Sequence, residues 1–189
     1  MNKFFVEIGS ADFDTLLPLA KLGWSGIIIE PNSEYLDNLE RYDNVIYENI
    51  AIESYNGEVE FIYYDAKSLI ERYGESLEWV KGVGTTNIFK NHMVWNPQWK
   101  EYELRRRVNC LTLDFLLEKY EVFSVDFMKV DVEGAECRIF NSYSWEVVPS
   151  VLKLESRHWS ESDIFTMNTM LEENGYLTWK ESNDWYSVR

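Results

Sequence analysis

The sequence predicts an α/β fold with a mainly parallel sheet, helices on both faces and one antiparallel strand near its C-terminal end. Strand-like and helix-like patterns alternate along most of the chain, as expected for β-α-β units. Three of the strand patterns end on glycine or an acidic residue, at Gly9, Glu30 and Asp131. Ligands of open α/β sheets bind at this carboxyl edge, so the pattern indicates a site for a nucleotide-like cofactor.

Length and charge restrict the possible classes of protein. The 189 residues suffice for one domain and barely for two, so we expect a single domain over residues 1–189. With 46% hydrophobic and 16% aromatic residues, the chain should fold on its own. The net charge of −15 argues against nucleic acid as a partner and against adhesion to anionic membranes, because both carry negative charge.

Several absences in the sequence favour a cytoplasmic protein. The apolar run near the N-terminus is interrupted at Glu7, which is not typical of a signal peptide. No stretch approaches the roughly 18 apolar residues that a membrane-spanning helix needs. Cys110 and Cys137 lie far apart with no metal-like spacing, so we expect buried thiols in a reducing compartment.

The first half of the chain shows repeated strand and helix patterns. The expected strands lie at residues 4–8, 26–30, 45–48 and 59–64, and the expected helices at about 15–22 and from about residue 32 onward. Asn32 or Ser33 can cap the second helix, because either side chain can accept a hydrogen bond from first-turn N–H groups. The turn Tyr55-Asn-Gly57 precedes the last of these strands.

Residues from about 67 to 107 interrupt the alternation, and we expect them to form an insertion or a lid over the site. The segment contains Gly82-Val-Gly84-Thr-Thr-Asn87 and an aromatic group: Phe89, Trp95, Trp99 and Tyr102. Those rings could stack on a sugar, although such residues more often pack a lid onto a core. The basic run Arg105-Arg-Arg107 could meet an anionic substrate, but a solvated strand face is the more common arrangement.

The alternation resumes after the insertion. The expected elements are a helix from Thr112 to about 120, strands at 127–132 and 151–154, a helix at 161–174, and a hairpin with strands at 176–179 and 185–188. Thr112 and Ser160 are suitable helix caps, and Gly175 is a suitable helix stop. The closing hairpin turns around Asn183-Asp184 and supplies the antiparallel strand.

The loop after the first strand offers one half of a cofactor site. Gly9 allows a tight turn whose exposed N–H groups could meet a cofactor's polar end. The Gly-x-Gly-x-x-Gly fingerprint is absent, because Ala11 and Phe13 occupy places where further glycines would fall. This crowding disfavours a dinucleotide and suits a cofactor without phosphates, such as S-adenosylmethionine. A plain strand-to-helix turn is the alternative.

Two further strand ends fit the rest of such a cofactor. Glu30 ends the second strand, where a carboxylate can accept both hydrogen bonds of a ribose diol. The alternative is a solvated acid beside a helix cap. The segment Asn49-Ile-Ala51 could border an adenine ring, and a loop without a ligand is an equally good interpretation.

The chemistry is expected at the end of the strand at 127–132. Asp131 and Glu133 could orient substrate hydroxyls, act as a base or hold a cofactor ammonium group, and Gly134 permits a sharp turn beside them. The alternative is that both carboxylates cap the next helix. His158 follows Glu155 on the same edge and is a better base candidate than His92, which lies in the insertion.

Taken together, these segments resemble the FkbM-type family of S-adenosylmethionine-dependent methyltransferases. The resemblance rests on Phe5-Val-Glu-Ile-Gly9, Ile29-Glu-Pro-Asn32, Asn49-Ile-Ala51, Leu111-Thr-Leu-Asp-Phe-Leu116, Phe127-Met-Lys-Val-Asp-Val-Glu-Gly-Ala-Glu136 and Leu152-Lys-Leu-Glu155. It covers about residues 4–155, except for the stretch 67–107. The family usually carries asparagine and glycine where Ala11 and Phe13 stand.

The resemblance implies a Rossmann-like class I methyltransferase fold with a seven-stranded, mainly parallel sheet and S-adenosylmethionine as cofactor. It implies the following cofactor contacts: Glu7, Gly9, Ser10 and Ala11 on the methionine side, Glu30 and Pro31 at the ribose, Asn49, Ile50 and Ala51 at the adenine, and Asp131 and Glu133 near the methyl group. Methyl transfer to a hydroxyl also requires a group that takes its proton, and Asp131, Glu133 or His158 could do so.

The function that follows is O-methylation of a hydroxyl on a sugar, glycan or small natural product, with a small-molecule or carbohydrate acceptor as the partner. One alternative is a non-catalytic binding protein of the same fold, which a pocket filled by Phe13 would favour. A less favoured alternative is an NAD-dependent oxidoreductase. Asp131, Glu133 and Glu155 could bind Mg²⁺ through oxygen, but their spacing does not require a metal, and we predict none.

Overall fold

The computed structural model describes residues 3–13, 15–86 and 97–189. Four residues named in the sequence analysis, Asn87, Phe89, His92 and Trp95, lie outside the described residues. Both cysteines are buried free thiols, as predicted. In the part of the chain that the structure describes, no helix has the length and apolar content needed to cross a membrane.

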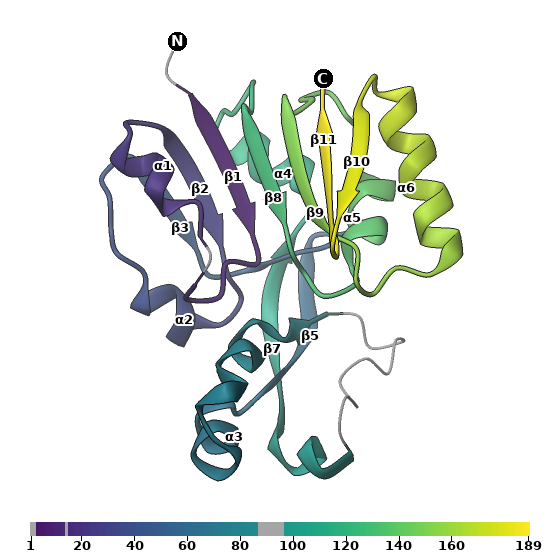
Figure 1. Cartoon of the computed structure of the whole chain (residues 1–189). Helices are drawn as coiled ribbons and strands as arrows, with labels where there is room; N and C mark the ends of the chain where they lie inside the picture. The colour runs from purple at the N-terminus through teal and green to yellow at the C-terminus, as the bar shows by residue number, and fades with distance from the viewer. Residues whose placement is uncertain (1–2, 14, 87–96) are drawn as a thin grey trace.

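The main sheet has seven strands in the order β10-β11-β9-β8-β1-β2-β3 (Figure 1). Its strands are β1 (Phe4–Ile8), β2 (Ser25–Ile29), β3 (Val45–Glu48), β8 (Phe127–Val130), β9 (Val151–Glu155), β10 (Leu177–Glu181) and β11 (Asp184–Val188). Neighbours from β3 to β9 pair in parallel, and β11 runs antiparallel to both β9 and β10. The predicted fold class is therefore confirmed.

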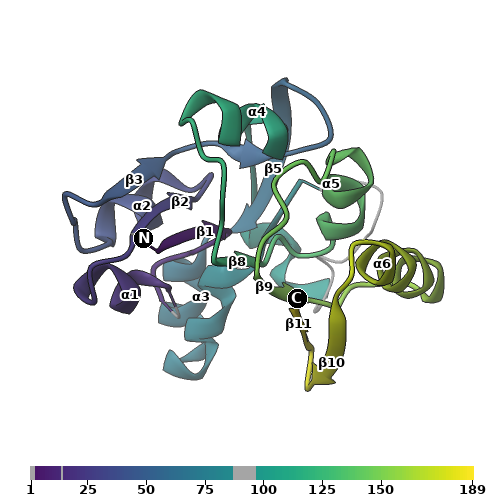
Figure 2. The same ribbon diagram turned by 90° about the horizontal axis from the view of Figure 1, so that it is seen from above.

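Helices cover both faces of this sheet. They are α1 (Leu17–Lys21), α2 (Ser33–Asn38), α4 (Leu113–Lys119), α5 (Glu136–Ser142) and α6 (Glu161–Glu173). Phe5 of β1 packs with α1 and α2 on one face, whereas Val6 and Ile8 pack with α4, α5 and α6 on the other. This division follows the two-residue period of strand side chains. Figure 2 shows α1 and α4 on opposite sides of the sheet.

Local side-chain chemistry sets where the helices begin. Of the two residues predicted to cap α2, Asn32 does so by accepting a hydrogen bond from the Glu34 N–H. Thr112 caps α4, and Ser160 caps α6 in a reciprocal capping box with Asp163. These caps confirm the positions that the sequence predicts for the start of each helix.

A second sheet forms from the middle of the chain. It contains β4 (Ala51–Ile52), β5 (Gly57–Tyr64), β6 (Gly84–Thr85) and β7 (Glu103–Leu111) in the order β4-β7-β5-β6. The strand expected at 59–64 belongs to this sheet, where it pairs antiparallel with β7 over its full length. The second sheet thus includes residues before and after the stretch 67–107 in the sequence, because β4 and β5 precede it and β7 continues beyond it. Figure 1 shows it facing the carboxyl ends of β1 and β8.

The second sheet has a small core of its own. It packs against α3 (Ala66–Tyr73) and two 3₁₀ segments, Glu75–Gly82 and Pro97–Tyr102. Trp99 is buried, with its ring 6.0 Å from that of Tyr64, and Tyr102 lies 6.3 Å from Tyr73. These two aromatic residues of the insertion therefore pack within it, which is the more common of the two arrangements considered.

Candidate active site

A pocket opens where the carboxyl ends of β1, β2 and β8 meet the second sheet. The space between its lining side chains, including the part open to solvent, is about 740 Å³. The main-sheet side includes Gly9, Ser10, Ala11, Phe13, Ile29, Glu30, Pro31, Ile50, Lys129, Asp131 and Val132. The side formed by the second sheet and its adjoining segments includes Ala51, Phe61, Tyr63, Lys81, Gly82, Gly84 and Thr86. The pocket thus lies between the two sheets.

Gly9 joins the strand ends that form the floor of this pocket. Its N–H donates to the Ile29 carbonyl at 2.9 Å, and its φ of +78° lies in the left-handed region. A Cβ atom added at Gly9 would lie 1.8 Å from the Asp131 carbonyl oxygen. Only glycine allows this approach, so the turn predicted at Gly9 exists because three strand ends converge there.

Glu30 is buried, with 5% of the residue exposed, so the interpretation as a solvated acid is wrong. Its Oε2 accepts a hydrogen bond from the Ala11 N–H at 2.8 Å, and its Oε1 accepts one from the Asn32 N–H at 2.7 Å. Burial raises the pKa of Glu30 to about 7, although the two backbone hydrogen bonds favour the charged form. Each oxygen keeps acceptor capacity for a ligand hydroxyl.

The segment after β3 contributes unevenly to the pocket. Ile50 and Ala51 line it, together with Pro31 from the turn after β2. Asn49 is exposed, and its side-chain amide donates to the carbonyls of Glu30 and Pro31 at 2.8 and 3.1 Å. Asn49 therefore fixes the turn that carries Glu30, and its contact with the pocket is indirect.

The loop after β1 leaves the pocket open. Ser10 is buried, and Ala11 adopts a φ of +47°, a left-handed conformation that is unfavourable for alanine. Phe13 is 43% exposed and lies against Gly82, where an added Cβ would be 3.0 Å from the ring. Phe13 thus forms a wall between the two sheets. The filled pocket that would favour a non-catalytic protein is not observed.

Glu7 lies behind the pocket. It is fully buried, and its Oε2 accepts a hydrogen bond from the Leu16 N–H at 2.8 Å. Its Oε1 lies 3.3 Å from Nζ of Lys129, which itself lines the pocket. Lys129 was missed in the sequence analysis, although a lysine inside the apolar run of β8 is a signal for a buried charged partner.

The three predicted catalytic residues separate into two groups. Asp131 lines the pocket, and burial, followed by the nearby charge of Glu133, raises its pKa to about 7. Glu133 and His158 do not line it. Glu133 Oε2 lies 2.6 Å from His158 Nε2, and Glu155 completes a cluster with them. Burial and the charge of Glu133 raise the pKa of Glu155 to about 9.

Neither Asp131 nor Glu133 caps helix α5, so that alternative is wrong. The cap residue is Ala135, and no side chain provides a capping hydrogen bond. Instead the fully buried Glu136 accepts hydrogen bonds from the N–H groups of Val132 and Gly134. Glu136 therefore holds the turn that carries Asp131 and Glu133.

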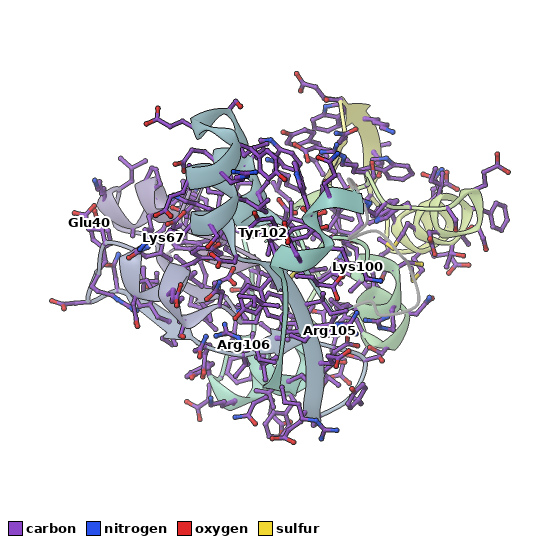
Figure 3. All side chains as sticks on the ribbon, turned by 90° about the horizontal axis from the view of Figure 1, so that it is seen from below. Glu40, Lys67, Lys100, Tyr102, Arg105 and Arg106 are labelled. Atoms are coloured by element: carbon purple, nitrogen blue, oxygen red, sulfur yellow. The ribbon has the colours of Figure 1, made fainter. Side chains whose placement is uncertain are left out.

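The basic run at residues 105–107 lies on β7 of the second sheet and does not line the pocket. Arg106 donates to the Pro31 carbonyl at 2.5 Å, and its guanidinium lies 5.1 Å from the centre of the Tyr63 ring. Arg105 pairs with Glu60 and Glu103, and Arg107 with Glu58, as expected for a solvated strand face. Figure 3, which views the molecule from below, shows Arg105 and Arg106 on the strands of the second sheet.

The pocket lining from β5 follows a local pattern that could have been recognised. Phe61 and Tyr63 are two residues apart and therefore share one face of the strand, and their rings stack at 5.3 Å. Tyr35, Lys81 and Thr86 also line the pocket. The sequence gives no comparable signal for these three, because none of them stands at the end of a predicted strand.

Comparisons with known proteins agree with the resemblance found in the sequence. A family model described as the methyltransferase FkbM domain matches residues 4–178. A protein named Methyltransferase 1, from Beauveria bassiana (strain ARSEF 2860), is 30% identical over 102 residues. That match covers 52% of this chain and 40% of the relative, so it spans less than half of the relative's length.

Among solved structures, the precorrin-6y C5,15-methyltransferase of Geobacter metallireducens GS-15 superposes on 99% of this chain and 78% of its own, with a TM-score of 0.42 and 13% identity. The family assignment rests on the family model, which covers all the strand ends described above. The chain therefore belongs to the family of the FkbM methyltransferase domain.

Proposed function

We propose that this chain is an S-adenosylmethionine-dependent O-methyltransferase that acts on a hydroxyl of a sugar, glycan or small natural product. The observation that carries the proposal is the pocket at the sheet edge, with Glu30 and Asp131 among its walls and apolar side chains between them. Family membership supports the methyl transfer, and the altered loop at Ala11 and Phe13 leaves the pocket open.

The residues present fit this cofactor chemically. Pro31, Ile50 and Ala51 offer an apolar surface suited to an adenine ring. Glu30 is fixed by two backbone N–H groups and retains acceptor capacity for a ribose diol. The carboxylate of Asp131 suits a cationic group at the opposite end. The net charge of the chain, −15, also favours a cationic ligand over a phosphorylated one.

The cofactor, when bound, supplies an electrophilic methyl group, and the chain has to orient the acceptor oxygen and take its proton. Asp131 is the residue that we assign to this second task, because it alone of the three predicted candidates lines the pocket. A pKa of about 7 leaves much of its carboxylate ionised near neutral pH, which suits a general base. The second sheet covers the site and limits access of water.

The experiment that tests this proposal is calorimetric titration of the purified chain with S-adenosylhomocysteine. We expect saturable binding that Glu30→Ala weakens by about tenfold or more, because the ribose loses its acceptor. Glu40→Ala is the matched control, since it removes one carboxylate at an exposed position that does not line the pocket. Thermal unfolding of each variant separates lost binding from lost structure.

The two outcomes lead to different next steps. Binding that depends on Glu30 justifies a screen of hydroxylated sugars and natural products for transfer of a labelled methyl group. Binding without transfer to any acceptor favours the non-catalytic alternative. Absence of binding at about millimolar S-adenosylhomocysteine contradicts the proposed cofactor.

A further inference from the structure

Two strand ends of the main sheet bring together, outside the pocket, three side chains of types that can ligate metal ions. Glu155 is the last residue of β9, and Glu133 follows β8, its parallel neighbour. His158 lies in the turn after β9. One ligand atom from each of these three residues lies within 4.8 Å of the others. We propose that Glu133, Glu155 and His158 bind a divalent transition-metal ion such as Mn²⁺ or Zn²⁺.

The backbone around Glu133 fixes the direction of its side chain. Glu133 adopts a φ of +55°, and the following Gly134 one of +96°. The Glu133 carbonyl accepts a hydrogen bond from Thr85 Oγ1 of the second sheet at 3.0 Å. The cluster is therefore assembled from the main sheet and secured by the second one, so its geometry is set before any ion binds.

The cluster is buried with an excess of negative charge. The side chains of His158 and Glu133 are only 9% and 14% exposed. Glu155 Oε2 is buried, and no hydrogen-bond donor reaches it among the residues that the structure describes. His158 can supply at most one positive charge to two glutamates. Buried charges require a partner, and a divalent cation would satisfy both carboxylates at once.

Glu53 provides a contrast, because both of its carboxylate oxygens accept hydrogen bonds from other side chains. Glu53 is 1% exposed, but Arg138 donates to both of its oxygens and Thr86 donates to one of them. Among the described residues no donor reaches Glu155 Oε2, and the charge of Arg157 only partly offsets the charges of the neighbouring acids. A buried acid that keeps an unsatisfied oxygen beside an imidazole is the arrangement expected of a ligand set.

The donor atoms favour a particular class of ion. Two carboxylates and one imidazole suit Mn²⁺, Fe²⁺ or Zn²⁺, whereas Mg²⁺ and Ca²⁺ prefer oxygen alone. Three protein ligands leave coordination positions open for water or a substrate oxygen. The set differs from the one considered from the sequence, because His158 takes the place of Asp131. Asp131 instead lines the adjoining pocket.

The site adjoins the proposed active site without belonging to its cofactor side. Glu133 lies two residues after Asp131, and their charges interact. If the proposed function holds, an ion at this place could bind hydroxyl oxygens of the acceptor. Binding of the metal itself requires neither the cofactor nor methyl transfer, so the two proposals succeed or fail separately.

The test is calorimetric titration of the chelator-treated chain with MnCl₂ and with ZnCl₂, in the absence of cofactor. We expect one ion per chain and a loss of affinity of about tenfold or more in both Glu155→Gln and His158→Gln. His158→Gln should affect Zn²⁺ more than Mn²⁺, because zinc has the stronger preference for nitrogen. Glu172→Gln, at an exposed position of α6, is the matched control and should bind as the native chain does.

A second measurement needs no variant and therefore no assumption about folding. X-ray absorption at the zinc edge should show one imidazole nitrogen together with oxygen ligands. Sulfur in the coordination shell would place the ion at a cysteine and overturn the proposal. So would an absence of saturable binding up to about 1 mM of either metal, or equal affinities of the native chain and both ligand variants.

Discussion

Two glutamates at the same edge of the main sheet, the buried Glu30 and the partly buried Glu155, differ in the hydrogen bonds that they receive. Glu30, at the end of β2, receives a backbone N–H on each of its oxygens, and its pKa is raised to about 7. Glu155, at the end of β9, has a buried oxygen without a donor among the described residues and faces other acids, and its pKa is raised to about 9. Burial raises the pKa of both residues, but backbone donors oppose that shift at Glu30, whereas the charges of neighbouring acids add to it at Glu155.

The largest effect on stability is expected at Gly9, which joins the ends of β1, β2 and β8. Gly9→Ala should destabilise the fold by about 3 kcal/mol or more, because the new Cβ would overlap the Asp131 carbonyl. Gly23→Ala is the matched control. Gly23 has a similar φ of +86° but no atom within 4 Å of an added Cβ, so only the conformational penalty of about 1 kcal/mol remains. Denaturant unfolding measures both, and equal losses would show that the close approach does not matter.

Removal of each glutamate tests the contrast between them directly. Glu30→Ala should lower the free energy of unfolding by about 2–4 kcal/mol, because it leaves the buried N–H groups of Ala11 and Asn32 without an acceptor. Glu155→Gln in metal-free buffer should change it by only about 0.5 kcal/mol, since no donor among the described residues reaches the buried Glu155 Oε2. Similar losses in the free energy of unfolding of the two variants would contradict the proposed difference between Glu30 and Glu155.

The pH dependence of ligand binding sharpens the description of Glu30. The pKa of Glu30 is raised from 4.5 to about 7, so the acceptor form is a minority at pH 6 and predominates at pH 8. S-adenosylhomocysteine should therefore bind up to about tenfold more tightly at pH 8 than at pH 6, a difference of about 1.4 kcal/mol. Glu30→Gln should show a flatter profile in calorimetry. An unchanged slope would assign the titration to another group, of which Asp131 is the nearest candidate.

The same shift predicts the sign of the effect on stability. In the window from pH 4.5 to about 7 the folded chain keeps a proton on Glu30 that the unfolded chain releases. Stability therefore falls as the pH rises through this window, by the linkage between proton uptake and unfolding. Thermal unfolding of the native chain and Glu30→Gln at matched pH values measures it, and the variant should lose this part of the pH dependence.

The smallest effect is expected at Ala11, whose N–H binds Glu30. Ala11→Gly should stabilise the fold by about 0.5 kcal/mol, because relief of the φ of +47° outweighs the greater freedom of glycine in the unfolded chain. Chemical denaturation is precise enough for this difference when native chain and variant are measured side by side. A destabilised variant would indicate that the methyl group of Ala11 packs in the pocket wall.

Much of the main sheet follows from local sequence patterns. The apolar runs that form β1 and β3, and the caps at Thr112 and Ser160, are properties of a few neighbouring residues. Glycines and acids at strand ends also predicted where the pocket would lie. The second sheet could not be predicted in this way, because β5 pairs with β7 across a long intervening segment.

The candidate site likewise contains some features that local sequence predicts and others that depend on the tertiary structure. The positions of Gly9, Glu30 and Asp131 follow from strand ends that the sequence marks clearly. The contact between Glu133 and His158 depends on how two turns fold over the sheet edge, which no local period encodes. Asn49 was predicted beside the adenine, but its amide is engaged with the turn after β2.

The pairing of β4 with the end of β7 has a consequence for how this protein can change. Ala51 lies opposite Cys110, so the chain enters and leaves the second sheet at neighbouring points. The chain between Ala51 and Cys110 is therefore a single insertion whose two ends are held together by strand pairing. Its length can vary at a small closure entropy and without moving β1, β2 or β8. The pocket wall that the second sheet forms can thus change by insertion or deletion while the strand ends on the other side of the pocket stay the same.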